Sequence, residues 1–180
     1  MSRKNLIPVV LAAALSFSCL TAAAQRKGQS ASAASTANPA DIANIRAAFK
    51  QINAMQLRKE EFTYEAAACA DGGVVQYFFK GKEIVKIIES GSVGDGSWKK
   101  EFYYQSGKFI FSYDLIEGES ADGHASKIEH RLYVKDGKVI RYLEDQQDIP
   151  EDGTATRDID IAGKLLEAYK TRQFANALCE

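Results

Sequence analysis

The sequence has few of the residue types that form most catalytic and metal sites. Its 180 residues contain two histidines, three cysteines, three prolines and one tryptophan. His124 lies in a glycine-rich stretch and His130 in a strand-like one, so the pair lacks a recognised metal-ligand spacing such as two histidines one helical turn apart. We therefore predict a protein that is not an enzyme, with no catalytic residue, no metal and no cofactor.

A small hydrolase is the alternative from a different class. His124 could act as a general base toward Ser120 or Ser126, and Cys69 could be a nucleophile. The simpler interpretation places His124 in a solvated loop and Cys69 in a disulfide or in the core. The glycine-rich segment "GSVGDGSW" lies between strand patterns and opens no helix, so it does not fit a phosphate-binding loop.

An excess of charge of one sign is also missing. Lysine and arginine together number 23 and aspartate and glutamate 24, and no basic tract interrupts this balance. Domains that bind nucleic acid carry clustered basic residues. We therefore expect no nucleic-acid partner, and the expected partner is an unknown protein or a small ligand.

The N-terminus carries the apolar run that could act in targeting. Arg3 and Lys4 precede the stretch "LIPVVLAAALSF", and the small residues of "TAAAQ" offer a cleavage site after Ala24. The run is too short for a stop-transfer helix. We predict a signal peptide over residues 1–24, no transmembrane segment in the mature chain, and export to the periplasm or the medium.

Cys19 leaves a second route open. A cysteine just after the apolar stretch can carry the lipid of a lipoprotein, although "SFS" before it lacks the expected leucine. In that case a lipid would tether the protein to the envelope membrane. Residues 25–38 are small and polar, which favours a flexible linker.

Two cysteines remain after cleavage, Cys69 and Cys179. In an oxidising compartment an isolated pair is more often a disulfide than a redox centre. The bond would close a loop of about 110 residues and stabilise the fold by on the order of 4–5 kcal/mol in the chain-entropy model. We treat it as a candidate disulfide, with free buried thiols as the alternative.

The rest of the chain begins and ends with helical periodicity. Asn38 and Pro39 are typical of a helix start, and apolar residues recur at helical spacing to about Leu57. A second apolar stripe starts near Ile159. The length between these ends fits a single domain over residues 39–180.

Between the helices the period changes from 3.6 to 2, and glycine-containing turn signals recur. The pattern predicts about seven strands, near 63–69, 74–79, 82–89, 98–105, 108–116, 127–135 and 138–145. Because the connections are short, an antiparallel meander is the economical topology. The predicted fold class is α+β, with an N-terminal helix, this meander and a C-terminal helix packed on the sheet.

Three segments share aromatic residues, a glycine turn and a β-branched run. They are "QYFFKGKEIVKII" (76–88), "EFYYQSGKFIFSY" (101–113) and "RLYVKDGKVIRYL" (131–143). Ser-Gly and Asp-Gly in the second and third fit two-residue hairpin turns. A sheet repeats its hairpins, whereas a catalytic motif has no need of copies.

The simplest register of these hairpins leaves apolar residues on the face away from the helices. That face should be mainly polar, yet it carries Tyr103 with Ile110 and Tyr133 with Ile140. We consider three explanations: the sheet curls to enclose both faces, the protein forms a dimer, or the row binds a partner. The candidate binding residues are Tyr103, Ile110, Arg131, Tyr133, Ile140, Arg141 and Tyr142.

Arg141 is the least expected residue of the third segment. It takes the position of Phe111 in the second segment, on the face assigned to the core, opposite Leu132. A buried guanidinium must find partners or lie at a sheet edge. Either Arg141 reaches a carboxylate from an edge strand, or it forms a clamp for an anion or a partner's carboxylate.

"IRAAFKQIN" (45–53) and the second and third segments resemble a widespread group of exported bacterial proteins of unknown function. That group has an Ile-Arg helix followed by hairpins of the form YYF-x-NGK-L-I-F and NR-x-YF-x-NGK-L-I-R. The resemblance covers about residues 41–147, and His130 stands where the group usually has asparagine. It implies export and a helix-plus-meander domain, and it implies no catalytic residues.

The function that these observations favour is an exported, non-enzymatic domain that binds a protein or a small ligand through its sheet and loop surfaces. A periplasmic inhibitor or immunity-like protein is the specific alternative in that class, because small disulfide-linked α+β domains suit tight docking on enzymes.

Overall fold

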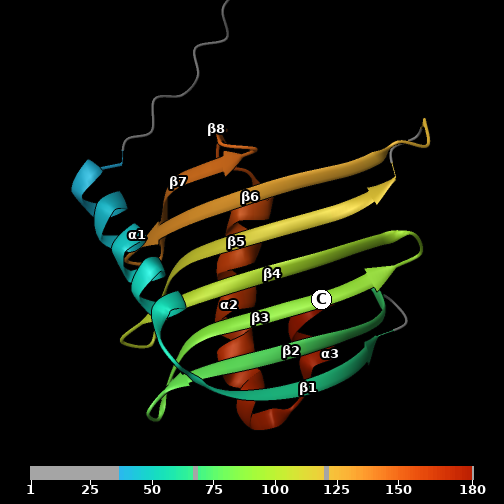
Figure 1. Cartoon of the computed structure of the whole chain (residues 1–180), viewed down its shortest axis with the longest axis horizontal. Helices are drawn as coiled ribbons and strands as arrows, with labels where there is room; N and C mark the ends of the chain where they lie inside the picture. The colour runs from blue at the N-terminus through green and yellow to red at the C-terminus, as the bar shows by residue number, and fades with distance from the viewer. Residues whose placement is uncertain (1–36, 67–68, 120–121, 180) are drawn as a thin grey trace, which may run out of the picture. The chain divides into compact units, whose positions relative to one another are not determined.

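The computed structural model describes residues 37–66, 69–119 and 122–179, which form one antiparallel sheet with helices on both faces (Figure 1). The predicted signal peptide, Cys19 and residues 25–36 of the predicted linker lie outside the described residues. No helix of the described part is long and apolar enough to cross a membrane.

The elements follow one another in a simple order. The helices are α1 (Pro39–Ala54), α2 (Gly153–Thr171) and α3 (Phe174–Leu178). The strands are β1 (Arg58–Ala66), β2 (Ala70–Lys80), β3 (Glu83–Val93), β4 (Gly96–Gln105), β5 (Lys108–Glu119), β6 (Ala125–Lys135), β7 (Lys138–Glu144) and β8 (Gln147–Asp148). Each strand pairs with its neighbours in sequence, giving the order β1 to β8. The predicted antiparallel meander with a helix before it and a helix after it is confirmed.

Helix α2 begins earlier than the predicted start near Ile159. Asp152 caps it, because its side-chain oxygen accepts hydrogen bonds from the backbone N–H groups of Thr154 at 2.9 Å and Ala155 at 3.2 Å. Aspartate is a favoured N-cap residue. The first turn buries a small residue, Ala155, rather than a large one. A pattern of large apolar residues therefore could not mark this start.

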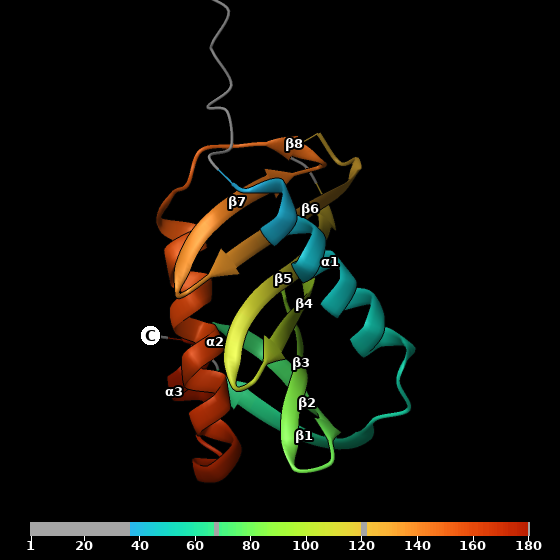
Figure 2. The same ribbon diagram turned by 90° about the vertical axis from the view of Figure 1, so that its left-hand side faces the viewer.

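The helices lie on opposite faces of the sheet (Figure 2). Helix α1 buries Ile42, Ile45 and Ile52 in a cluster with Tyr103 and Phe111 of the sheet. Both helices were expected on one face of the sheet, and this expectation is wrong. Helix α1 covers the other face.

Helices α2 and α3 cover the other face. Tyr77 and Tyr104 are fully buried there, and their hydroxyls donate hydrogen bonds to the carbonyl oxygens of Leu165 at 2.7 Å and Ala162 at 2.9 Å. Burial raises the pKa of both tyrosines. The two hydroxyls therefore remain protonated donors that fix α2 on the sheet.

The three repeated segments each contain a β-bulge just after the turn. The extra residue is Val85 in the first segment, Ile110 in the second and Ile140 in the third. All three belong to the α1 cluster or pack against it. Because a bulge bends its strand and increases the local twist, the repeat shapes three hairpin ends to fit beneath α1.

These bulges overturn the predicted facing of β7. The simple register paired Arg141 with Leu132 and Tyr142 with Arg131. The structure pairs Arg141 with Tyr133 and Tyr142 with Leu132. Arg141 therefore lies on the α1 side, and Tyr142, 4 % exposed, packs on the α2 side.

Cys69 and Cys179 form a disulfide whose Cα atoms are 5.6 Å apart, within the usual range for such a bond. The bond joins the residue before β2 to the residue after α3. Phe174 and Ala177 of α3 are buried in the α2-side core. The disulfide therefore ties the end of the chain to the sheet that α3 covers.

Candidate functional site

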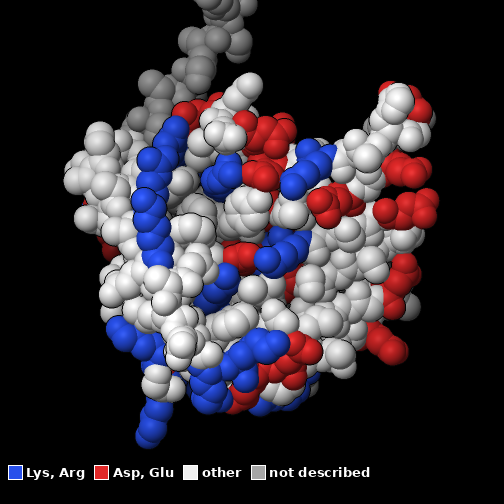
Figure 3. Space-filling view, in the orientation of Figure 1, with Lys and Arg blue, Asp and Glu red and all other residues white. Residues whose placement is uncertain are grey.

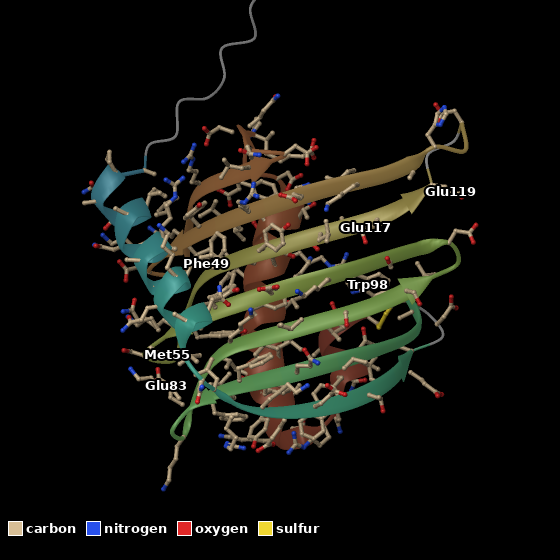
Figure 4. All side chains as sticks on the ribbon, in the orientation of Figure 1. Phe49, Met55, Glu83, Trp98, Glu117 and Glu119 are labelled. Carbon is tan, nitrogen blue, oxygen red and sulfur yellow. A yellow bond between two sulfur atoms is a disulfide. The ribbon has the colours of Figure 1, made fainter. Side chains whose placement is uncertain are left out.

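A groove of about 610 Å³ lies between α1 and the sheet, within the usual range of small-molecule sites. Phe49, labelled in Figure 4 where α1 crosses the strands, belongs to its lining. Helix α1 contributes Ile45, Arg46, Phe49, Lys50 and Asn53, and strands β3 to β6 contribute Lys86, Glu101, Phe111, Tyr113, Glu129, Arg131 and Tyr133.

Aromatic rings form the floor of the groove. Phe49 lies 5.4 Å from Phe111 between ring centroids, and Phe111 lies 5.0 Å from Tyr133, both edge to face. Phe49 also contacts Tyr103 at 4.9 Å. Contacts of this geometry are favourable beyond the area they bury. The floor is therefore a packed aromatic surface held from both the helix and the sheet.

The charge of the groove differs from that of the chain. Its lining contains four cationic side chains and two carboxylates, namely Arg46, Lys50, Lys86 and Arg131 with Glu101 and Glu129. The whole chain has a net charge of −1. Basic side chains line α1 and the neighbouring sheet, whereas acidic ones gather at the edge of this face far from α1 (Figure 3). The groove is thus the more attractive part of this face for an anion.

Lys86 and Glu101 form a buried ion pair at one end of the groove, with 2.7 Å between Nζ and Oε2. Lys86 also donates to Asn53 Oδ1 at 2.9 Å, and the Tyr103 hydroxyl donates to Glu101. Burial by itself raises the pKa of Glu101, but Lys86, Lys99 and Tyr103 outweigh it and lower the pKa to about 2. This pair is satisfied within the protein.

The other cations of the groove have fewer partners within the protein. Arg46 Nε donates to the Tyr133 hydroxyl at 3.3 Å, and Lys50 has no ion pair or hydrogen bond among the described residues. Arg131 donates to Glu129 at 2.6 Å and lies over the ring of Tyr113 at 5.4 Å. Arg46 and Lys50, both exposed on α1, are therefore the cations available to an incoming ligand.

The predicted binding residues separate into different environments. Tyr103 is 0 % exposed and Tyr133 is 4 % exposed beneath α1. Ile110 and Ile140, the bulge residues, are partly buried there, and Tyr103 pairs with Phe111 rather than with Ile110. Of the three explanations for this row, enclosure by the protein itself therefore applies, although α1 covers the row rather than a curl of the sheet.

Two of the seven predicted binding residues line the groove, and the other five do not. Arg131 and Tyr133 line the groove. Arg141 reaches a carboxylate through two hydrogen bonds with Asp148 of β8, at 2.7 and 2.8 Å, but its own strand β7 is not the edge of the sheet, because β8 pairs with it. Tyr142 stacks on His130 on the opposite face.

A row of ionisable residues crosses the α2 side of the sheet. Successive strands β3 to β7 place these residues opposite one another in the order Glu89, Lys100, Asp114, His130 and Glu144. Glu89 and Asp114 are buried, at 3 % and 4 % exposure. This row was not predicted from the sequence. The pattern that could have indicated it is a set of charged residues at strand positions whose neighbours on the same face are apolar.

Glu89 is fully supplied with donors. The Tyr64 hydroxyl donates to Oε1 at 2.6 Å, and the Trp98 indole N–H contacts Oε1 at 2.9 Å and Oε2 at 2.7 Å. Burial raises the pKa of Glu89 despite these donors. This carboxylate is therefore structural rather than free to bind.

Lys100 bridges two carboxylates in the middle of the row. Its Nζ lies 2.8 Å from Asp158 Oδ1 of α2 and 3.3 Å from Asp114 Oδ2. The second oxygen, Asp114 Oδ1, is buried and has no hydrogen-bond partner among the described residues, and the same is true of His130 Nδ1. An unsatisfied buried polar atom costs about 1–3 kcal/mol. A donor to Asp114 Oδ1 would remove that cost.

The described candidate catalytic residues have different surroundings. Cys69 is in the disulfide, Ser120 lies outside the described residues, and Ser126 is half-buried in β6. The His124 side chain is 83 % exposed, with Nε2 3.9 Å from Asp122. In the described ranges, no three His, Cys, Asp or Glu side chains are placed to hold a metal ion.

Comparisons with family models, with curated proteins and with solved structures found no match to this chain. Two hollows lined by described residues bear on function, the groove beside α1 and a smaller one beneath α2.

Proposed function

We propose that this domain is an exported, non-enzymatic binding protein whose groove beside α1 takes a small organic anion with an apolar body, such as an aromatic or fatty carboxylate. The observation that carries the proposal is the pairing of an aromatic floor with a net positive rim in one groove of about 610 Å³. Sites of this kind combine apolar area with a few placed polar groups.

The proposed position of the ligand follows from which polar groups of the groove already have partners within the protein. The apolar body lies on the rings of Phe49, Phe111 and Tyr113, and the acidic group meets Arg46 and Lys50 on α1. Glu101 is neutralised by Lys86, so it does not repel the ligand strongly. A cation over the same floor would face the positive charges of Arg46 and Lys50, which disfavours cationic ligands.

Export is part of the proposal and is supported by the N-terminal sequence and by the disulfide, which is stable in oxidising compartments. In that setting the domain captures its ligand outside the cytoplasm. The resemblance to exported bacterial proteins with the same hairpin pattern agrees with this placement.

The experiment that tests the proposal is a titration with 8-anilinonaphthalene-1-sulfonate, an aromatic anion whose fluorescence rises in apolar sites, followed by displacement with laurate. We expect saturable binding with a Kd on the order of 10 μM. Replacing both Arg46 and Lys50 with alanine should weaken binding by about tenfold or more, because the acidic group loses its partners.

The matched control is Lys170→Ala, an exposed cation of α2 on the other side of the sheet. It should leave the Kd unchanged. Dodecyltrimethylammonium, with a similar apolar chain and the opposite charge, should fail to displace the probe. Equal displacement by laurate and by this cation, or a wild-type Kd in the double variant, would show that the groove does not select anions.

A further inference from the structure

The second hollow of the domain lies beneath α2, on the face opposite the groove. It has a volume of about 290 Å³ and is lined by strands β1, β3, β4 and β5, the first half of α2, and the disulfide end of the chain. Its lining consists of Tyr64, Cys69, Glu89, Trp98, Lys100, Asp114, Ile116, Thr154, Arg157, Asp158, Ile161 and Leu178. We call it the α2 cavity.

The α2 cavity contains an acceptor without a donor. The Asp114 side chain is 6 % exposed, lines the cavity, and leaves Oδ1 without a hydrogen-bond partner in the described part of the chain. Its other oxygen already meets Lys100. Since buried polar atoms are almost always paired, Asp114 Oδ1 marks the place where a donor group of a ligand would lie.

The charges around this acceptor nearly cancel. Lys100 contacts both Asp114 and Asp158, Arg157 also lines the cavity, and Glu89 accepts hydrogen bonds from Tyr64 and Trp98. A cavity of this kind favours a neutral ligand with several hydroxyl groups over an ion of either sign.

One wall of the α2 cavity is apolar and flat. The Trp98 ring lies across Gly91, where an added Cβ would be 2.4 Å from the ring carbon Cζ2. Ile116, one of two exposed large apolar side chains among the described residues, is 40 % exposed at the same cavity. Trp98 is labelled in Figure 4 near the ends of β3 and β4 that lie away from α1. Such a wall fits the C–H face of a sugar ring.

We propose that the α2 cavity binds a neutral polyhydroxylated molecule of monosaccharide size. A ligand hydroxyl donates to Asp114 Oδ1, Arg157 donates to a ligand oxygen at the mouth, and the ring packs against Trp98 and Ile116. Arg157 is exposed and has no partner among the described residues, so it is free for this contact. This site is independent of the groove beside α1.

Trp98 provides the measurement, because the chain has one tryptophan. The full mature chain is titrated with glucose, N-acetylglucosamine and myo-inositol while its fluorescence is recorded. We expect a saturable change for at least one of them, with a Kd on the order of 1 mM. Glucosamine and glucuronate, charged analogues of similar size, should each bind at least about fivefold more weakly than the best neutral probe.

Two variants locate the site. Asp114→Asn should raise the Kd by about tenfold and Arg157→Ala by about threefold, while the control Lys170→Ala, at the other end of α2, leaves it unchanged. Arg157→Ala carries the test alone if Asp114→Asn does not fold, as judged by circular dichroism. The proposal is overturned if no neutral probe gives a saturable change, if a charged analogue binds more tightly, or if Arg157→Ala keeps the wild-type Kd.

Discussion

At the residue scale, the carboxylate of Glu89 restricts which residues can lie next to it in the sheet. Tyr64 and Trp98 both reach over the sheet to donate to it, and each ring crosses a glycine on the neighbouring strand, Gly73 and Gly91. An added Cβ would lie 2.3 Å from the Tyr64 ring at Gly73 and 2.4 Å from the Trp98 ring at Gly91. These two glycines are therefore needed for close approach rather than for an unusual backbone.

Gly91→Ala tests this arrangement. The new methyl group should displace the Trp98 ring, weaken its bond to Glu89 and lower the free energy of unfolding by about 1–3 kcal/mol. Urea unfolding followed by circular dichroism measures the change. The matched control is Gly72→Ala, where nothing lies within 4 Å of an added Cβ, and it should change the stability by less than about 0.5 kcal/mol. Equal losses in both variants would contradict the role given to Gly91.

At the scale of elements, the bulged hairpins and the terminal helices depend on each other for their packing. Three hairpin ends carry Val85, Ile110 and Ile140 toward α1, which covers them with Ile42, Ile45 and Ile52. The other face is closed by α2, and the short α3 completes it through Phe174 and the disulfide. A five-residue helix has too few internal hydrogen bonds to be stable alone. Helix α3 therefore depends on this attachment.

Replacing both Cys69 and Cys179 with serine tests that dependence. The loop that the bond closes has a sequence separation of 110 residues, so the free energy of unfolding should fall by about 4 kcal/mol. In the double variant, the amide hydrogens of α3 should exchange faster than those of α2. Dithiothreitol should reproduce the loss in the wild type and have no effect on the double variant. Unchanged exchange in α3 after reduction would show that Phe174 alone holds the helix.

At the scale of the whole molecule, the two faces of the sheet hold buried charge in opposite ways. On the α1 side, burial favours protonation of Glu101, but Lys86, Lys99 and Tyr103 lower its pKa to about 2, below the ordinary 4.5. On the α2 side, burial raises the pKa of Glu89 and Asp114. Lowering the pH therefore removes the stabilisation that charged Glu101 gives on the α1 side. On the α2 side it relieves the free-energy cost of burying the charges of Glu89 and Asp114.

Glu101→Gln separates the two contributions. Because the pKa of Glu101 is lower in the folded state, its stabilisation is complete above pH 4.5 and is lost as the pH falls toward 2. The variant should be less stable than the wild type by about 3 kcal/mol at pH 7, and this difference should shrink toward pH 2. Urea unfolding across this pH range measures it.

Glu117→Gln is the control for the acid titration, because its side chain is 54 % exposed. Its stability should follow that of the wild type at every pH. A difference between Glu101→Gln and the wild type that stays constant from pH 7 to pH 2 would mean that the carboxylate charge is not what stabilises this end of the groove.

Much of the architecture could be predicted from local patterns. The period of 2, the glycine turns and the short connections indicated the meander, and Asn38 with Pro39 marked the start of α1, where Asn38 Oδ1 accepts a hydrogen bond from Ala40 N. The facing of Arg141 and Tyr142 could not be predicted, because one extra residue in a strand exchanges the faces of all that follow. The groove was missed for the same reason, because the simple register placed Phe111 and Tyr133, which both line it, on opposite faces of the sheet.

The sequence by itself determined the order of the strands and the turns between them, because these depend on neighbours a few residues apart. The tertiary structure alone decided that α1 and α2 lie on opposite faces, that Cys69 meets Cys179, and that Glu89, Lys100 and Asp114 stand in one row. These features depend on packing between segments far apart in the chain. The burial and the pairing of these residues depend on several elements together, so they cannot be predicted from any single stretch of sequence.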